Sequence, residues 1–228
     1  MFKELLLQWQ AHQGLTSPPS EPILLWREQN RSVWIANAWG PAIPYGPVDH
    51  GDGHQNHGYK RVKGNPEAVR NIPEAQGWPE FQEFLITVNG AESPIESVGC
   101  EKGFFPVDLA GDALIKLGSY IDVIFTELTL NERPETLLLL ASRLLHAVKG
   151  CESWWGDVEI ALQPFKGILG VADAPWGLLL RVTNHGRNRE EARKFWGETL
   201  RRLGKAISQL PSDFRFRETN TENGSHGE

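Results

Sequence analysis

Apolar and polar positions alternate most regularly in the C-terminal half of the chain. The segment from Tyr120 to Leu128 alternates and is rich in β-branched and aromatic side chains, which predicts a strand with one buried face. Pro134 suits the first turn of a helix, where its missing N–H removes no helical hydrogen bond. The residues from Pro134 to Lys149 are apolar around most of a helical circumference, and Gly150 follows as an end signal. This pattern predicts a largely buried helix.

Two more strands and a second helix are predicted further along. Residues 157–162 alternate cleanly, whereas residues 177–182 are almost continuously apolar, as in a central strand. The link between them contains several prolines and glycines, which favours a hairpin with a long loop over a helix. Asn188 can cap the last helix, whose apolar face runs from Ala192 to Leu210 before Pro211 ends it.

These elements predict an α+β fold, a two-layer sandwich in which an antiparallel sheet carries two helices on one face. Their order, β-α-β-β-α, is an incomplete ferredoxin-like plait in the C-terminal half of the chain. The strand that would complete it must come from the front half. We expect a single domain over residues 1–213, with the α+β core at 79–213, and a flexible polar tail at 214–228.

The N-terminal half, residues 1–78, is less regular. A short amphipathic helix is predicted at residues 2–13, and a hairpin at residues 23–27 and 33–36. Residues 39–76 form a long irregular segment rich in glycine and proline, interrupted by a short helix near Pro66 to Arg70. Residues 84–88 favour a strand, although residues 80–83 could begin a helix. The turn at Asn89 and Gly90 connects this segment to a partner strand over 95–105. Residues 109–117 fit no clear pattern beyond one helical turn.

Composition narrows the class of protein. The net charge of −6 argues against nucleic-acid binding over the whole surface, although a local basic patch stays compatible with it. Two cysteines are too few for a disulfide-stapled secreted scaffold. No signal peptide and no apolar run of about 20 residues is present, so we expect a soluble, cytoplasmic protein with no membrane partner.

The segment around residue 50 concentrates possible metal ligands. His50, Asp52, His54 and His57 have side chains that bind zinc or another divalent metal. The glycines between them disfavour a metalloprotease helix, and the spacing matches no ligand pattern with a known mechanism. We therefore expect no cofactor and a polar loop, and keep a metal-dependent hydrolase or nuclease as the alternative.

Carboxylates also lie on the predicted strands. Asp157 and Glu159 should point to one face of the sheet, and Asp122 can share that face. Such a group could bind a metal in the manner of a nuclease. The ordinary reason for this spacing is the solvent-facing side of a sheet, which is the interpretation that we expect to hold.

The C-terminal helix is locally basic. Arg187, Arg189, Arg193 and Arg201, with tryptophans nearby, could form a groove for nucleic acid, as in an accessory subunit that binds it. Glutamates are interleaved with these arginines at helical spacing. A solvated helix face therefore explains the pattern better than a nucleic-acid interface does.

Aromatic residues of the N-terminal half carry the leading functional hypothesis, and the alternative is that they cover the core beneath the long loop. Trp34, Trp39, Tyr45 and Tyr59 lie in and around the irregular segment, and tryptophan and tyrosine are favoured anchors of protein interfaces. Neither a Gly-x-Ser-x-Gly elbow nor a phosphate-binding loop is present. We therefore expect a non-enzymatic protein–protein interaction domain, namely a subunit, an adaptor or an inhibitor of the immunity type, that binds another protein through these aromatics.

Overall fold

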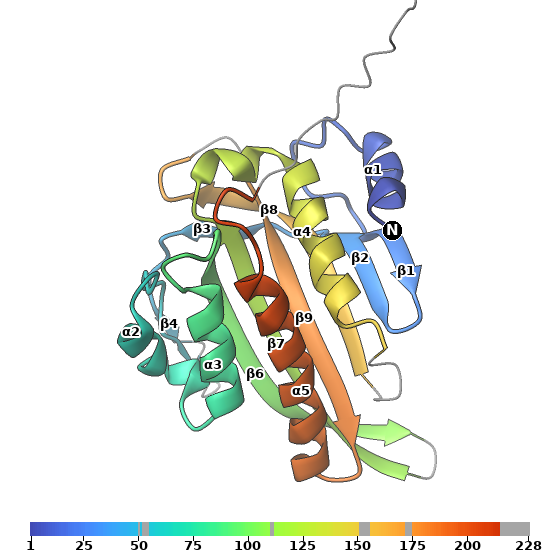
Figure 1. Ribbon diagram of the computed structural model, residues 1–228, viewed down its shortest axis with the longest axis vertical. Coiled ribbons are helices and arrows are strands. Elements are labelled where there is room, and N and C mark those ends of the chain that lie inside the picture. Colours follow the sequence, from blue (N-terminus) through green and yellow to red (C-terminus); the bar gives the residue numbers. More distant parts are fainter. Residues whose placement is uncertain (50, 52–54, 110–111, 151–155, 172–174, 215–228) are drawn as a thin grey trace, which may run out of the picture.

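The computed structural model describes residues 1–49, 51, 55–109, 112–150, 156–171 and 175–214. Its elements alternate between helices and strands along the chain (Figure 1). In order they are α1 (Phe2–Gln10), β1 (Ile23–Glu28), β2 (Arg31–Ile35), β3 (Gly40–Ile43), β4 (Val48–Asp49), β5 (Gln55–Asn56), α2 (Pro66–Arg70), η1 (Pro73–Ala75), α3 (Pro79–Val88), β6 (Ile95–Leu109), β7 (Asp112–Phe125), η2 (Leu128–Glu132), α4 (Pro134–Ala147), β8 (Gly156–Ile168), β9 (Trp176–Gly186) and α5 (Arg189–Ser208).

Seven strands form one sheet in the order β1-β2-β8-β9-β7-β6, with β3 also paired to β8. The predicted plait is present, because β9 lies between β7 and β8 and is antiparallel to both. Strand β6 occupies the open place beside β7 and is antiparallel to it, so the missing strand does come from earlier in the chain. The sheet is nevertheless mixed, because β2 and β3 run parallel to β8.

Helices cover one face of this sheet, as predicted for a two-layer α+β sandwich. Figure 1 shows α3, α4 and α5 lying across the strands, with α1 beside β1. Trp196 of α5 is fully buried on this face, and its indole N–H donates to Ser119 Oγ of β7 at 2.9 Å. The two predicted helices, α4 and α5, therefore share a face, and α3 joins them by an ion pair between Glu80 and Arg193 at 2.8 Å.

Two local predictions were wrong. Residues 84–88, predicted as a strand, belong to helix α3, because Phe81, Phe84, Leu85 and Val88 recur at helical spacing and are all buried. Pro79 begins that helix at a position where proline is tolerated. Residues 112–117, which fitted only a helical turn, form the first part of β7 because they pair with β6 over the whole segment.

The N-terminal segment covers part of the opposite face. A second, smaller core joins Ile43 of β3 to side chains from β6, β7 and β8, with Tyr45 and Tyr59 packed against it. The short helix at Pro66–Arg70 lies where the sequence predicts it, capped by Asn65. The N-terminal residues thus belong to the same sheet and cores as the C-terminal half, while the boundary of the expected domain stays a prediction.

Two further observations concern the ends and the surface. Phe214, the first residue of the predicted tail, is buried and stacks on Phe125 with ring centroids 6.0 Å apart, and the rest of that tail lies outside the described residues. Within the part of the chain that the structure describes, no helix combines the length and apolar composition needed to cross a membrane.

Candidate functional site

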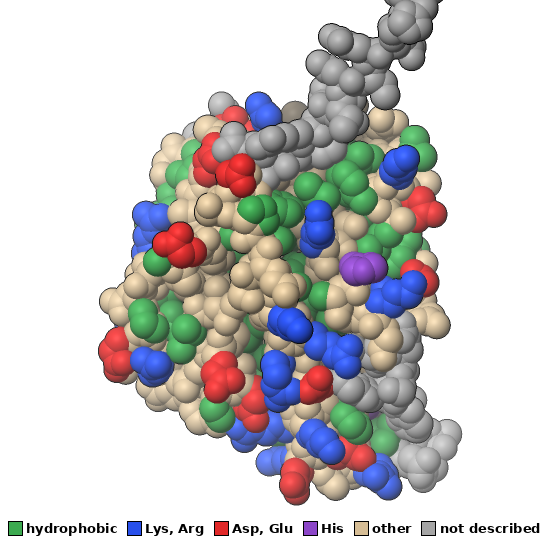
Figure 2. Space-filling model, viewed as in Figure 1, with side chains coloured by type: hydrophobic (Ala, Val, Ile, Leu, Met, Phe, Trp, Pro, Cys, Tyr) green, Lys and Arg blue, Asp and Glu red, His purple; other side chains and the backbone are tan. Residues whose placement is uncertain are grey.

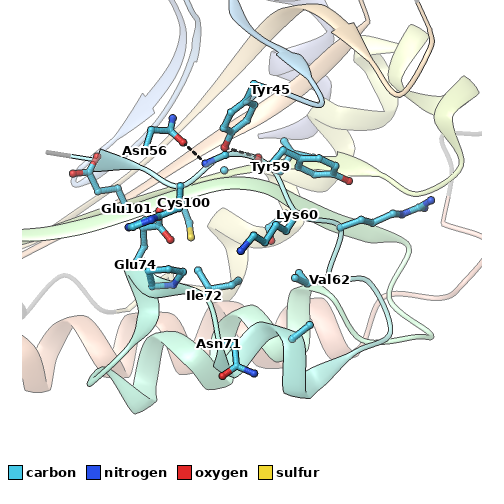
Figure 3. A pocket seen from close by; sticks show the side chains of 18 of the residues that line it. Tyr45, Asn56, Tyr59, Lys60, Val62, Asn71, Ile72, Glu74, Cys100 and Glu101 are labelled. Atoms are coloured by element: carbon cyan, nitrogen blue, oxygen red, sulfur yellow. Dashed lines mark hydrogen bonds between the residues drawn. The ribbon is translucent and has the colours of Figure 1, made fainter. Parts of the chain in front are cut away.

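A pocket of about 560 Å³ lies along the outer edge of β6. Figure 3 shows Tyr45 and Tyr59 on one side of it and Asn71 and Ile72 on the other, with the Lys60 side chain extending between them. Its lining comes from the irregular segment, from α2 and η1, from β6 and from β7; the residues are Tyr45, Asn56–Val62, Ala68, Asn71–Glu74, Ser97–Glu101 and Tyr120. A segment without regular structure therefore forms one wall, and a sheet edge forms another.

Side-chain bonds fix the irregular wall against β6. Tyr45 Oη donates to the carbonyl oxygen of Val98 at 3.1 Å. Arg61 makes two hydrogen bonds, of 3.1 and 3.2 Å, to the buried carboxylate of Glu96. Lys63 Nζ donates to the first carbonyl oxygen of β6 at 2.7 Å. Because these bonds hold the wall in place before any ligand arrives, the pocket is pre-organised.

Tyr45 and Tyr59 share this wall. The Tyr59 backbone N–H donates to the Tyr45 carbonyl oxygen at 2.9 Å, and the two rings are tilted by 53° with centroids 6.4 Å apart. Burial raises the pKa of Tyr45 to about 12, and burial also raises the pKa of Tyr59. Both phenols are therefore neutral at physiological pH. The Tyr59 hydroxyl is buried and has no hydrogen-bond partner among the described residues.

A buried carboxylate lies beside the pocket. Asp122 of β7 pairs with Gly99, one of the lining residues of β6, and only 8% of Asp122 is exposed. Its Oδ1 atom has no hydrogen-bond partner among the described residues. Burial raises the pKa of Asp122 from 3.8 to about 7, although the charge of Arg181 acts in the opposite direction. The carboxyl group is thus close to half ionised at neutral pH.

Acidic and basic side chains both line the pocket. Glu74 and Glu101 line it, and their charges, like that of Asp122, oppose ionisation of the neighbouring Cys100. Arg61 is paired with Glu96, whereas the exposed Lys60 extends into the pocket. The pocket therefore combines aromatic walls with side chains of both signs.

Cys100 is the candidate nucleophile at this site. Burial raises the pKa of its thiol to about 12, and the charges of Glu74 and Asp122 add to the effect. A protonated thiol is a poor nucleophile. His57 also lines the pocket, but no hydrogen bond joins it to Cys100 in the described part of the chain. The Cys100 thiol is therefore protonated at neutral pH. Cys151 lies outside the described residues.

The four aromatic residues predicted to bind a partner fall into two groups. Tyr45 and Tyr59 meet in the pocket. Trp34 lies on β2, separated from β6 by three strands, where its indole N–H donates to Ser32 Oγ at 2.9 Å and the Arg27 guanidinium lies 5.3 Å from its ring centroid. Trp39 is 38% exposed in the link between β2 and β3 and does not line the pocket.

Most of the predicted metal ligands lie outside the residues that the structure describes. His50, Asp52 and His54 are not among the described residues, and His57 is partly buried in the pocket wall. The residues that are described contain no group of three or more His, Cys, Asp and Glu side chains able to hold a metal ion. The zinc alternative therefore stays a prediction.

The predicted basic residues lie on or next to α5, among acidic partners. Figure 2 shows Lys and Arg side chains interspersed with Asp and Glu on this face of the molecule. Arg193 pairs with Glu80 of α3, and the guanidinium of Arg189 lies 5.2 Å from the Phe104 ring centroid. The other two arginines pair with glutamates of α5, as Arg187 does with Glu191 and Arg201 with Glu198.

Sequence reasoning missed several residues of the site. Asp122 was expected on the solvent-facing side of the sheet with Asp157 and Glu159, and it does lie on the face opposite the helices, but it is buried. No pattern in the sequence indicated that Gly99 or Glu74 would line a pocket. The carboxylate between Ile121 and Val123, close to the apolar run that ends the strand, was the available hint.

Comparisons with known proteins do not extend this description. No protein family, no curated protein and no solved structure matches the chain significantly. The site is therefore interpreted from its own residues.

Proposed function

We propose that the protein is a non-enzymatic binding protein, of the adaptor, subunit or inhibitor type, that binds a partner protein through the pocket beside β6. One observation carries the proposal: Tyr45 and Tyr59, two of the aromatics expected to form an interface, are held in a pre-formed pocket of about 560 Å³. Tyrosines are strong interface anchors because they offer large contact area and lose little conformational freedom.

The chemistry of the pocket supports binding. Its thiol, Cys100, is held protonated, and its phenols are held neutral, so none of these groups is activated as a nucleophile or base. The hydroxyl of the wall residue Tyr59 has no hydrogen-bond partner among the described residues, and a bound partner can satisfy it. A pre-formed concave site with a few unsatisfied polar groups is typical of specific recognition.

Site-directed photo-crosslinking tests where the partner binds. The photoreactive amino acid p-benzoylphenylalanine would replace Lys60, which is exposed and extends into the pocket. In a matched variant it would replace Lys205, an exposed lysine of α5 on the helical layer. Each variant is irradiated in an extract of the native host, and adducts are identified by mass spectrometry.

We expect one protein to be crosslinked from position 60 and not from position 205, and excess unmodified protein should abolish the adduct. Adducts of equal yield from both positions would contradict the proposal. Adducts that excess unmodified protein fails to compete away would contradict it as well, because a specific site is saturable.

A further inference from the structure

We propose that the pocket beside β6 is a receptor for a cationic side chain, in which the Asp122 carboxylate, with Tyr45, Tyr59 and Tyr120 around it, holds the ammonium or guanidinium group of a lysine or arginine of the partner protein. The inference rests on the proposed function and names the chemical group that the pocket recognises. It accounts for a buried carboxylate whose Oδ1 atom has no hydrogen-bond partner among the described residues.

The first observation concerns one oxygen atom of Asp122. Its Oδ1 atom is buried and has no hydrogen bond to any described residue. Arg181 lowers the pKa of Asp122 through its charge, but its side chain is exposed and forms no ion pair with Asp122 in the described part of the chain. A buried charge without a partner lowers stability. Such groups persist where a function requires them, and strongly perturbed carboxyls concentrate at functional sites.

The second observation is the close packing of this carboxylate on the edge strand. Gly99 lines the pocket, and a Cβ atom placed on it would lie 2.9 Å from Asp122 Oδ2 and 3.5 Å from Tyr45 Oη. Glycine therefore lets the carboxylate approach a residue of the pocket lining, next to the Tyr45 phenol. The register of β6 shifts between Ser97 and Gly99, so this contact lies at an irregularity of the edge strand.

The third observation is the arrangement of charges at the pocket. The charge that acts on Asp122 is that of Arg181 from β9, while Asp122, Glu74 from η1 and Glu101 from β6 oppose ionisation of the neighbouring Cys100. Two bases line the pocket: Arg61 is bound to Glu96, and Lys60 is exposed to solvent. Neither of these bases forms an ion pair with Asp122 among the described residues, which leaves the carboxylate for a cation supplied by the partner.

The aromatic walls add a second attraction. A cation placed over a tyrosine ring is stabilised by about 0.5–2 kcal/mol, most strongly where water is excluded. Tyr45, Tyr59 and Tyr120 all line the pocket. A lysine or arginine side chain also offers an apolar stem, which suits a pocket with Val62 and Ile72 in its lining. A free inorganic cation would leave these apolar contacts unused.

Cation binding should depend on pH. Only the ionised carboxylate attracts the cation, and burial holds the pKa of Asp122 at about 7 in the free protein. Affinity is therefore expected to rise as the pH increases from 5.5 to 8, and binding should release a proton near neutral pH.

The test uses small probes on the full chain, followed by ¹⁵N–¹H NMR. The probes are the blocked amino acids Nα-acetyl-lysine methylamide and Nα-acetyl-arginine methylamide, and the neutral analogue is Nα-acetyl-norleucine methylamide. The variants are Asp122→Asn, which removes the charge and keeps the shape, and Gly99→Ala, whose methyl group displaces the carboxylate from the edge strand. Asp157→Asn is the matched control, because Asp157 is an exposed aspartate on the same face of the sheet outside the pocket.

We expect a charged probe to shift the amides of residues 97–101 and 58–60, and norleucine to bind at least tenfold more weakly. Asp122→Asn and Gly99→Ala should each weaken the charged probe at least tenfold, whereas Asp157→Asn should leave its Kd within twofold. Equal affinity of wild type and Asp122→Asn overturns the inference, as does equal binding of norleucine. If position 60 crosslinks a partner while the charged probes leave the pocket amides unshifted, this inference is wrong and the proposed function stands.

Discussion

Replacing Asp122 with asparagine should stabilise the protein at alkaline pH. The carboxyl has a pKa of about 7 in the folded chain because burial disfavours its charge, whereas an unfolded aspartate titrates near 3.9. A folded-state pKa above the unfolded value means that the fold is favoured while the group is protonated. That contribution is complete below about pH 4 and is lost as the pH rises through about 7.

The magnitude follows from the two pKa values. A difference of about three in pKa corresponds to about 4 kcal/mol, which is the stability that ionisation of Asp122 removes by pH 8. Asparagine has nearly the same shape and never carries the charge. The Asp122→Asn variant should therefore match the wild type near pH 4 and exceed it by up to about 4 kcal/mol at pH 8.

Urea unfolding at pH 4, 5, 6, 7 and 8, followed by tryptophan fluorescence, measures this difference. All other titrating groups are common to both proteins, so their contributions cancel in the comparison. Asp157→Asn serves as the control and should differ from wild type by a constant amount, because its carboxylate is exposed. The reasoning is refuted if the Asp122→Asn difference does not change with pH, or if the variant is the less stable protein at pH 8.

Three further outcomes are expected. Tyr45→Phe should lower the free energy of unfolding by about 1 kcal/mol, because it removes the hydrogen bond to Val98. Tyr59→Phe should leave the free energy of unfolding unchanged or raise it, since the Tyr59 hydroxyl has no hydrogen-bond partner among the described residues. Equal losses of stability in urea unfolding of the two variants would contradict this prediction. In a Cys151→Ser background, the raised pKa of Cys100 should make its reaction with Ellman's reagent slow at pH 8, and rapid labelling of the native protein would contradict it. Asn188→Ala should destabilise the protein by about 1 kcal/mol, because the Asn188 side chain caps α5 by accepting a hydrogen bond from the Glu191 backbone N–H at 2.9 Å. An unchanged melting temperature would contradict this prediction.

The C-terminal fold could be predicted because its signals are local. The apolar face of α5 and the proline that begins α4 depend only on neighbouring residues, and both helices lie where the sequence places them. Helix α3 also carried a local signal, with buried residues at helical spacing, but the β-branched residues Ile86, Thr87 and Val88 favoured a strand. Burial against α5 decided the outcome, since packing overrides weak propensity.

The site could not be predicted because it depends on distant contacts. Strand β2 pairs in parallel with β8, more than 100 residues later, and no local pattern specifies that partner. Asp122 looks like a solvent-facing strand residue until Tyr45 and the irregular segment fold against β6 beside it. The aromatic content of the N-terminal half indicated an interface, but only the folded chain shows that Tyr45 and Tyr59 belong to one pocket while Trp34 and Trp39 do not.

The central claim is that the pocket beside β6 receives the partner protein. Hydrogen–deuterium exchange on the complex, formed with the protein that position 60 crosslinks, tests it most directly. The account predicts slower exchange at residues 57–62 and 97–101, which line the pocket, and no change on α4 and α5. Slower exchange on α5 with an unchanged pocket would contradict it.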